Sequence, residues 1–203
     1  DRIIETITKQ KISMLPGPPT LYQSILTSEL IETMDISSLR LGVTGAASIP
    51  VQLIKDMKEK LGFDTVITAY GLTESTGVVT MCTPDDDYKT IATTSGCAIA
   101  DVEVKCVNQD GLDVPAGEPG EIFVRGYNIT QGYFNNPEAT QEAIDADGWL
   151  HTGDIGILDA NGYIKITDRI KDMFIVGGFN AYPAEIENIL CDHPAISQVA
   201  VIG

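Results

Sequence analysis

Hydrophobic positions in the first third of the chain alternate between helical spacing and short apolar runs. Helical spacing over residues 1–11 predicts one helix, and the prolines at 18–19 open a second. The apolar faces of these two predicted helices consist of Ile3, Ile4, Ile7, Leu21, Ile25 and Leu26. The chain is therefore expected to begin with two helices that each bury one side.

Two apolar runs, LRLGVT at 39–44 and DTVITAY at 64–70, are typical of buried strands. Between them, Ser48 can cap a helix and Pro50 can start it. The apolar face of that helix is expected to comprise Val51, Ile54, Met57 and Leu61. A strand, a helix and a strand in this order favour a parallel sheet, so residues 1–95 are expected to form an α/β subdomain.

The hydrophobic period changes to two in the middle of the chain. VEVKCV at 102–107, EIFVRG at 121–126 and YIKITD at 163–168 alternate as half-buried strands do. Asp-Gly and Asn-Gly pairs beside these runs predict tight turns. We expect residues 96–168 to form an antiparallel β subdomain, a small barrel.

The pattern changes once more in DRIKD at 168–172, where charge replaces the apolar alternation. Beyond it, FIV predicts a short strand, Pro183 starts a helix, and QVAVIG at 198–203 begins another strand. Residues 169–203 are therefore expected to open a third, small α+β domain after a hinge.

Charge and cysteine content narrow the functional classes. The net charge of −16 disfavours non-specific binding to nucleic acid or to an anionic membrane, which needs clustered Lys and Arg. No apolar run approaches the length of roughly 18 residues that a membrane span needs. The four cysteines show no CxxC spacing, which favours reduced thiols in a cytoplasmic protein over a zinc or redox motif.

The stretch TAYGLTESTG at 68–77 leaves a predicted strand and at once presents Gly71, Thr73 and Glu74. A glycine allows close backbone approach to a ligand, a hydroxyl can meet a phosphate, and a carboxylate is a hard ligand for Mg²⁺. The alternative is a surface turn with a solvated glutamate. The ten residues alone leave both interpretations open.

The stretch VTGAASIP at 43–50 also joins a strand to a helix, where backbone N–H groups can hold an anion. VTGAA is also found at the start of short-chain dehydrogenases, a different reaction class. The further glycines that let a helix pack against pyrophosphate are missing, and no tyrosine has a lysine four residues later. The oxidoreductase is the less favoured alternative.

Two further stretches carry candidate ligand groups. GWLHTGDIG at 148–156 presents Asp154, which could accept hydrogen bonds from a ribose diol or sit in an Asx turn, and His151 reads as a turn or packing residue. In TDRIKDMFIVGG at 167–178, Arg169 and Lys171 could contact a nucleotide or act at an interdomain joint, or could be a solvated linker.

Taken together and in order, YGLTE, GYFNNPEAT (132–140), WLHTGD and DRIKDMFIVGGFNAYPAEIE resemble the adenylate-forming superfamily of acyl-CoA synthetases, adenylation domains and beetle luciferases. The resemblance covers essentially the whole chain and is strongest to fatty-acid–CoA ligases. It implies part of the large N-terminal domain of such an enzyme, a parallel sheet with helices and a small antiparallel barrel, plus the start of the small C-terminal domain.

The resemblance implies a two-step reaction that uses ATP, Mg²⁺ and CoA. A fatty or other apolar carboxylic acid attacks the α-phosphate of ATP to give acyl-AMP, and the CoA thiolate then displaces AMP. Gly45, Ala46 and Ala47 would lie beside adenine and the acyl group, Tyr70 would pack on adenine, Gly71 would allow close approach, and Thr73 would meet the α-phosphate. Glu74 would hold Mg²⁺, Asp154 and Arg169 the ribose, Lys171 would act as hinge, and Gly177 and Gly178 would line the pantetheine tunnel.

The chain departs from the family pattern in two ways. A Ser/Thr/Gly-rich phosphate loop should precede it and a catalytic lysine should follow it, so the chain is expected to be an internal fragment that is inactive alone. An acyl-AMP ligase that loads a carrier protein is an alternative, although the span 74–96 looks too short for its insertion. A non-catalytic nucleotide-binding module is another. A homodimer of the parent is possible, and small residues at 15–19 and 43–45 suit an extended or bulky apolar acid.

Overall fold

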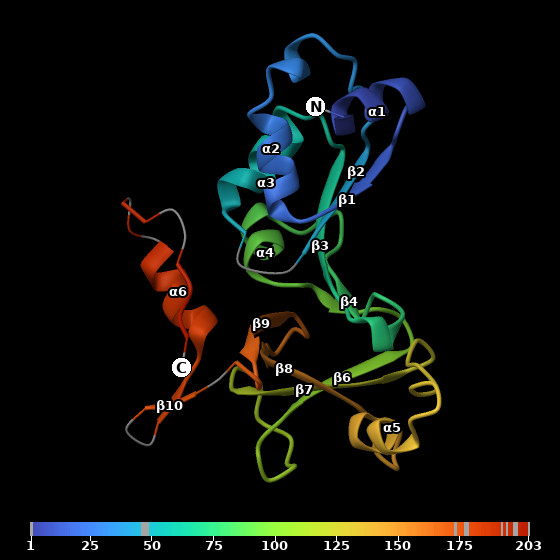
Figure 1. Cartoon of the computed structure of the whole chain (residues 1–203), viewed down its shortest axis with the longest axis vertical. Helices are drawn as coiled ribbons and strands as arrows, with labels where there is room; N and C mark the ends of the chain where they lie inside the picture. The colour runs from blue at the N-terminus through green and yellow to red at the C-terminus, as the bar shows by residue number, and fades with distance from the viewer. Residues whose placement is uncertain are drawn as a thin grey trace. The chain divides into compact units, whose positions relative to one another are not determined.

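A computed structural model of the chain describes residues 2–45, 49–172, 174–176, 179–191, 193, 195–196 and 199–202. The chain divides into two compact units (Figure 1). The first comprises Asp1–Tyr70 and Thr80–Cys97, and the second comprises Gly71–Val79 and Ala98–Gly203. The backbone therefore passes between the units three times, after residues 70, 79 and 97. The predicted three-part division at 95 and 168 stays a prediction.

The first unit is built on strands covered by helices. Its helices are α1 (Arg2–Gln10), α2 (Pro19–Leu26), the 3₁₀ helix η1 (Glu29–Glu32), α3 (Val51–Glu59) and α4 (Tyr88–Thr93). The strands are β1 (Met14–Pro16), β2 (Leu41–Thr44), β3 (Thr65–Tyr70), β4 (Thr80–Met81) and β5 (Cys97–Ala98), in the order β1-β2-β3-β4-β5. β1, β2 and β3 are parallel, as predicted for β2 and β3, and β4 is antiparallel to β3.

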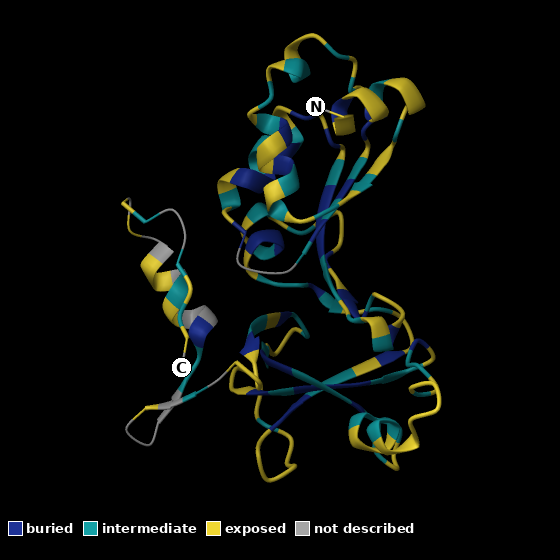
Figure 2. Ribbon diagram, in the orientation of Figure 1, coloured by how far each residue is buried: buried dark blue, intermediate teal, exposed yellow. Residues whose placement is uncertain are grey.

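Apolar helix faces and the parallel strands form the core of this unit, with α2, α3 and α4 drawn together on one side of β1–β3 (Figures 1 and 2). In α1, Ile4 and Ile7 are buried, but Ile3 is 42% exposed, so the prediction that all three share the buried face is wrong. Ile4 and Ile7, three residues apart, share the buried face, and Ile3, although four residues before Ile7, lies at the edge of that face. Leu61 is buried as predicted, although α3 ends two residues before it.

Prolines mark the starts of two helices in this unit. Pro18 is the N-cap of α2 and Pro19 its first helical residue, where a missing N–H costs nothing. Pro50 is the N-cap of α3, so the helix starts at Val51. The predicted capping residue Ser48 lies outside the described residues.

The second unit contains the predicted antiparallel strands. These are β6 (Val102–Val107), β7 (Pro119–Gly126) and β9 (Ile164–Arg169). A further strand, β8 (Leu150–Leu158), is not among those predicted, and the four pair in the order β6-β7-β8-β9. The unit also holds the 3₁₀ helix η2 (Thr73–Ser75), α5 (Pro137–Ala143), the hairpin β10 (Phe174–Val176) and β11 (Phe179–Ala181), and α6 (Pro183–Cys191). Residues 199–202 form no strand, which corrects the prediction for QVAVIG within the residues described there.

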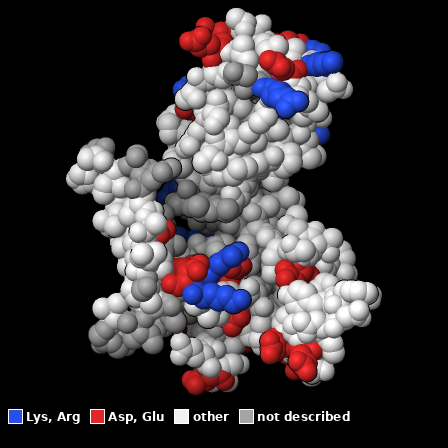
Figure 3. Space-filling model, viewed as in Figure 1, with Lys and Arg blue, Asp and Glu red and all other residues white. Residues whose placement is uncertain are grey.

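On the face seen in Figure 3, acidic and basic side chains lie near one another. The chain as a whole has a net charge of −16. Cys82 and Cys106 are buried free thiols, and Cys97 is half-buried. In the part of the chain that the structure describes, no helix is long and apolar enough to cross a membrane.

Candidate functional site

Two predicted site residues of the first unit lie at the ends of its parallel strands. Gly45 directly follows β2, and a Cβ there would lie 2.7 Å from the Ala69 carbonyl oxygen, so a glycine is needed for this approach. Tyr70 ends β3, where it pairs with Thr80 of β4. Ligands of open α/β sheets bind beyond such carboxyl ends. Ala46 and Ala47 lie outside the described residues.

The loop 71–79, which carries Thr73 and Glu74, belongs to the second unit and turns back sharply on itself. A Cβ at Gly71 would lie 2.3 Å from the Gly77 carbonyl oxygen, so the two ends of the turn meet in backbone contact. Thr76 closes η2 in the left-handed region with φ 58°. Thr73 is exposed and Glu74 is half-buried on this turn.

Asn128, which follows β7, fastens the loop. Its Nδ2 donates to the carbonyl oxygens of Ser75 at 3.2 Å and of Val78 at 2.7 Å. Its own carbonyl accepts a hydrogen bond from Thr76 Oγ1 at 2.8 Å. Because Asn128 is only 8% exposed, these contacts hold the loop from inside the unit. The sequence did not indicate this residue.

Glu74 is held through both its main chain and its side chain. Thr130 N donates to the Glu74 carbonyl oxygen at 2.7 Å, and Tyr133 Oη donates to Glu74 Oε1 at 2.7 Å. The hydrogen bond to the carboxylate raises the pKa of Tyr133, so the phenol keeps its proton. Sequence reasoning did not give Tyr133 a role, although it lies in GYFNNPEAT, one of the stretches that carried the resemblance.

Asp154 and Arg169 lie opposite each other in the β8–β9 pair, with Arg169 Nε 3.2 Å from Asp154 Oδ1. Asp154 is a buried strand residue, which makes the Asx-turn alternative wrong. Ile170 N donates to the Gly153 carbonyl oxygen at 2.8 Å, so backbone pairing with β8 extends one residue past Arg169. The structure thus brings together the two residues that the resemblance places on the ribose.

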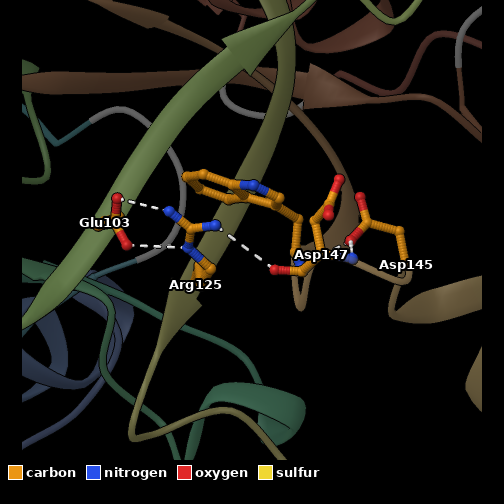
Figure 4. A network of polar contacts seen from close by, with 5 residues as sticks. Glu103, Arg125, Asp145 and Asp147 are labelled. Atoms are coloured by element: carbon orange, nitrogen blue, oxygen red, sulfur yellow. Dashed lines mark hydrogen bonds and ion pairs between the residues drawn. The ribbon is translucent and has the colours of Figure 1, made fainter.

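A polar cluster on the same sheet is structural (Figure 4). Arg125 donates to both carboxylate oxygens of Glu103, at 2.8 and 2.9 Å, and through Nη1 to the Asp147 carbonyl oxygen at 3.4 Å. The Arg125 guanidinium lies 4.4 Å from the ring centroid of Trp149, and Lys105 Nζ lies 4.7 Å from it. These contacts join β6, β7 and the start of β8.

His151 lies within this part of the sheet as a packing residue, one of the two roles expected for it. Its ring stacks on Phe123 with centroids 4.0 Å apart. Its Nε2 lies 3.5 Å from Asp145 Oδ2, too far for a strong hydrogen bond. Because His151 is in β8, the turn alternative does not hold for it.

Lys171 lies in a turn directly after β9, where it is exposed and Asp172 N donates to the Arg169 carbonyl oxygen at 3.1 Å. The turn begins one residue past the Asp154–Arg169 pair, and the hinge role of Lys171 stays a prediction. Gly177 and Gly178 lie outside the described residues.

Glu74 fits a magnesium ion that is shared with a nucleotide. Within the described residues, no group of three or more His, Cys, Asp or Glu side chains could hold a metal by itself. Mg²⁺ is usually bound by one or two carboxylates together with substrate phosphates and water, so one carboxylate on a fixed turn is enough. Glu74 has its Oε1 engaged by Tyr133, which leaves Oε2 for such a cation.

Comparison with known proteins places the chain in a family. The model of the AMP-binding enzyme family matches residues 1–134. The chain belongs to the AMP-binding enzymes. This confirms the resemblance to the adenylate-forming superfamily and replaces the oxidoreductase alternative.

Curated relatives are named as CoA ligases. The chain is 51% identical over 202 residues to a Rhodococcus jostii (strain RHA1) ligase for a propanoyl group that carries a 7a-methyl-1,5-dioxo-octahydro-indenyl ring, with 100% of this chain and 37% of the relative covered. It is 36% identical over 201 residues to a long-chain-fatty-acid–CoA ligase of Escherichia coli O6:H1, with 99% and 35% covered. The chain thus spans little more than a third of these relatives.

Solved structures share the fold over the whole chain. An anthranilate CoA ligase in complex with anthranoyl-AMP superposes with a TM-score of 0.84 at 34% identity, covering 100% of this chain and 38% of that one. The O-succinylbenzoate coenzyme A synthetase of Bacillus subtilis, in complex with ATP and magnesium ion, gives a TM-score of 0.84 at 32% identity, covering 100% and 41%. The predicted sheet with helices followed by antiparallel strands is therefore confirmed. In place of the predicted small barrel, the described residues form a four-stranded sheet in which β6 and β9 are the two edges.

Proposed function

We propose that a protein of the relatives' length containing this chain is an AMP-forming acid–thiol ligase. It activates a carboxylic acid with ATP to acyl-AMP and transfers the acyl group to CoA. The observation that carries the proposal is Glu74, a carboxylate fixed on a turn by Thr130 and Tyr133. The relatives named as CoA ligases, and a similar structure in complex with ATP and magnesium ion, support it.

In the first step, an oxygen of the acid attacks the α-phosphorus of ATP, and the bond to pyrophosphate breaks. Bound Mg²⁺ would neutralise charge on the phosphates, and Glu74 is the residue that would hold it. Thr73 presents its hydroxyl on the same turn, where it would meet the α-phosphate. The chain forms no covalent bond to the acid, so its contribution is positioning and charge stabilisation.

The nucleoside would be held by residues from strand ends. Tyr70, together with the loop at 45–47, would pack against adenine, and Gly71 would let the backbone come close. The Asp154 carboxylate would accept hydrogen bonds from the ribose hydroxyls, and Arg169, 3.2 Å from it, would donate to the same sugar. The Asp154–Arg169 pair supports this assignment because its charges are complementary and already adjacent.

In the second step, the CoA thiolate attacks the acyl carbonyl carbon and AMP leaves with the bonding electrons. Lys171, in the turn after β9, is the residue about which the following segment would rotate between the two steps. Gly177 and Gly178 would line the path of the pantetheine arm. CoA is proposed as acceptor over a carrier protein because the relatives are named as CoA ligases.

The substrate is proposed to be an apolar carboxylic acid, either fatty or bulky and cyclic. The relative at 51% identity is named for a ring-bearing propanoyl group, and one at 36% is named for long-chain fatty acids. Cytoplasmic catalysis is part of the same proposal, since Cys82 and Cys106 are free thiols of the kind that a reducing compartment maintains. A homodimer stays a prediction, which sedimentation would test.

The test is a substrate screen of a protein that contains this chain and is as long as the curated relatives. Release of AMP is measured with and without CoA across fatty acids of different length, a bicyclic propanoic acid and an aromatic acid. We expect CoA-dependent turnover with at least one apolar acid, and loss of metal-dependent acyl-AMP formation in Glu74→Gln. Nucleotide binding without any acyl-CoA product would overturn the proposal in favour of a binding module.

The 203-residue chain alone provides a second measurement. It is expected to catalyse no exchange of pyrophosphate into ATP, because the phosphate loop and the catalytic lysine expected for this family are not among its residues. Exchange by this chain would contradict that expectation.

A further inference from the structure

Tyr133 and Glu74 are joined by a short hydrogen bond across 59 residues of sequence. The Tyr133 hydroxyl donates to Glu74 Oε1 at 2.7 Å, and both residues belong to the second unit. Tyr133 is 42% exposed and Glu74 is half-buried, so burial does not explain the contact. A hydrogen bond to a carboxylate is roughly twice as strong as one between neutral groups.

The backbone of Tyr133 is itself fixed by the start of α5. Tyr133 N donates to Thr140 Oγ1 at 2.9 Å, and Thr140 Oγ1 donates to the Asn136 carbonyl oxygen at 2.9 Å. Asn136 N in turn donates to the Tyr133 carbonyl oxygen at 3.1 Å, and Asn136 Oδ1 caps α5 by accepting from Ala139 N at 3.1 Å. The helix start therefore sets where Tyr133 stands.

Gly132 allows this arrangement. A Cβ there would lie 2.6 Å from Thr140 Cγ2, and its φ of 135° is one that side chains rarely adopt. Each of these residue types in the stretch GYFNNPEAT thus has a structural role. The glycine lets the chain close on Thr140, the Asn-Pro pair starts the helix, and the tyrosine is aimed at Glu74.

We infer that Tyr133 is a positioning residue for the Glu74 carboxylate, holding Oε1 so that Oε2 meets the divalent cation shared with the nucleotide. The inference rests on the proposed function, in which Glu74 is the metal ligand. Two effects oppose each other, because a donor draws charge from the carboxylate but also fixes its direction. Hydrogen-bonded partners of metal ligands typically contribute 10–100-fold to metal affinity, so orientation is expected to dominate.

The direct test is the variant Tyr133→Phe, made in a protein that contains this chain and is as long as the curated relatives. Its equilibrium binding of Mn²⁺ is measured by electron paramagnetic resonance in the presence of ATP. The variant is expected to bind Mn²⁺ about tenfold more weakly. Binding of ATP without metal is expected to be unchanged, which a general loss of structure would not allow. The matched control is Tyr127→Phe, a tyrosine of the same segment that is 74% exposed, and it should behave as wild type.

A double-mutant cycle with Glu74→Gln shows whether Tyr133 acts through Glu74. The glutamine amide still accepts the tyrosine hydroxyl but carries no charge. Because the metal ligand is then already impaired, adding Tyr133→Phe should produce little further loss of Mn²⁺ binding. An undiminished effect of Tyr133→Phe in the glutamine background would overturn the inference.

The remaining outcomes separate the inference from the proposed function. Normal Mn²⁺ binding by Tyr133→Phe, with weak binding by Glu74→Gln, overturns only the positioning role. Normal binding by Glu74→Gln overturns both. If Tyr133→Phe does not fold, Thr140→Val removes the oxygen that accepts from Tyr133 N and should weaken Mn²⁺ binding, while Thr140→Ser should retain it. Equal binding by the two Thr140 variants would then overturn the inference.

Discussion

Arg169 reaches Asp154 across the β8–β9 pair, yet the two side chains lie in opposite environments. The Arg169 side chain is 72% exposed, whereas that of Asp154 is 9% exposed. The carboxylate is therefore set in the sheet, and the guanidinium is an exposed partner at its edge. A ligand with hydroxyl groups could bind to this pair while displacing only the arginine.

The first prediction concerns Arg169→Gln. It should lower the free energy of unfolding by no more than about 1 kcal/mol, because an exposed guanidinium is screened by solvent. Affinity for AMP should fall about tenfold, because a charge-assisted donor to the sugar is lost. Urea unfolding and calorimetry measure the two quantities. Lys165→Gln, which removes an exposed cation from the same strand, serves as control, and an equal loss of AMP affinity there would contradict the ribose assignment.

The second prediction concerns Asn128→Ala. The substitution removes two donors to the Ser75 and Val78 carbonyl oxygens from a nearly buried site, and should destabilise the protein by about 2–3 kcal/mol. The loop 71–79 should also become the first site of limited proteolysis. Asn128→Asp should be at least as damaging, because it replaces the donors with a buried charge. Wild-type stability in either variant would show that the loop is held by other contacts.

The third prediction compares two glycines with positive φ. A Cβ at Gly96, φ 75°, would lie 1.9 Å from the Met81 carbonyl carbon, whereas one at Gly117, φ 91°, would meet nothing within 4 Å. Gly117→Ala should cost only about 1 kcal/mol of backbone strain. Gly96→Ala should cost more than about 3 kcal/mol, because backbone has to move. Thermal unfolding of both variants measures the difference, and similar midpoints would refute it.

The fourth prediction is a pH dependence at Asp145. Partial burial by itself raises the pKa of Asp145, but hydrogen bonds from Trp149 N and Asp147 N, together with the His151 side chain 3.5 Å away, outweigh it and bring the pKa below its usual range. Because the folded pKa is the lower one, the stabilisation is present above the unfolded value of about 3.9 and is lost as pH falls through the folded pKa. Asp145→Asn should lose less stability than wild type in urea unfolding between about pH 5 and pH 3. An equal loss of stability in the variant and in wild type would contradict this pH dependence.

The fifth prediction tests the hinge. Lys171→Pro fixes φ in the turn after β9. Within the proposed function, it should spare acyl-AMP formation, followed by pyrophosphate exchange, and slow thioester formation, followed by acyl-CoA release. Equal loss of both half-reactions would count against Lys171 as the residue about which the following segment rotates.

The parallel pair β2–β3 could be predicted because both apolar runs are buried and a helix separates them. The exposure of Ile3 could not, because helical spacing leaves the edge of an apolar face uncertain by one residue. Residues 199–202 show a further limit. Alternation makes a segment able to form a strand, but a strand exists only where a neighbour offers its backbone.

The candidate site divides in the same way. Asp154 could be singled out as a carboxylate, but the two glycines around it lower strand propensity and suggest a turn, whereas the sheet keeps this segment extended. The contact between Glu74 and Tyr133 has no local signal at all, because both residues lie outside periodic segments and are 59 positions apart. Such pairings depend on how loops are folded against a sheet, which periodicity does not encode.

The backbone passes between the two units after residues 70, 79 and 97, and this limits where segments can be exchanged between homologues. A hybrid made by joining two homologues after residue 97 would take the loop 71–79 from one parent and Asn128 from the other. The carbonyl groups of the loop and the side-chain amide that donates to them would then come from different parent proteins. Functional hybrids should therefore be those in which the loop 71–79 and Asn128 come from the same parent, even though nearly fifty positions lie between them.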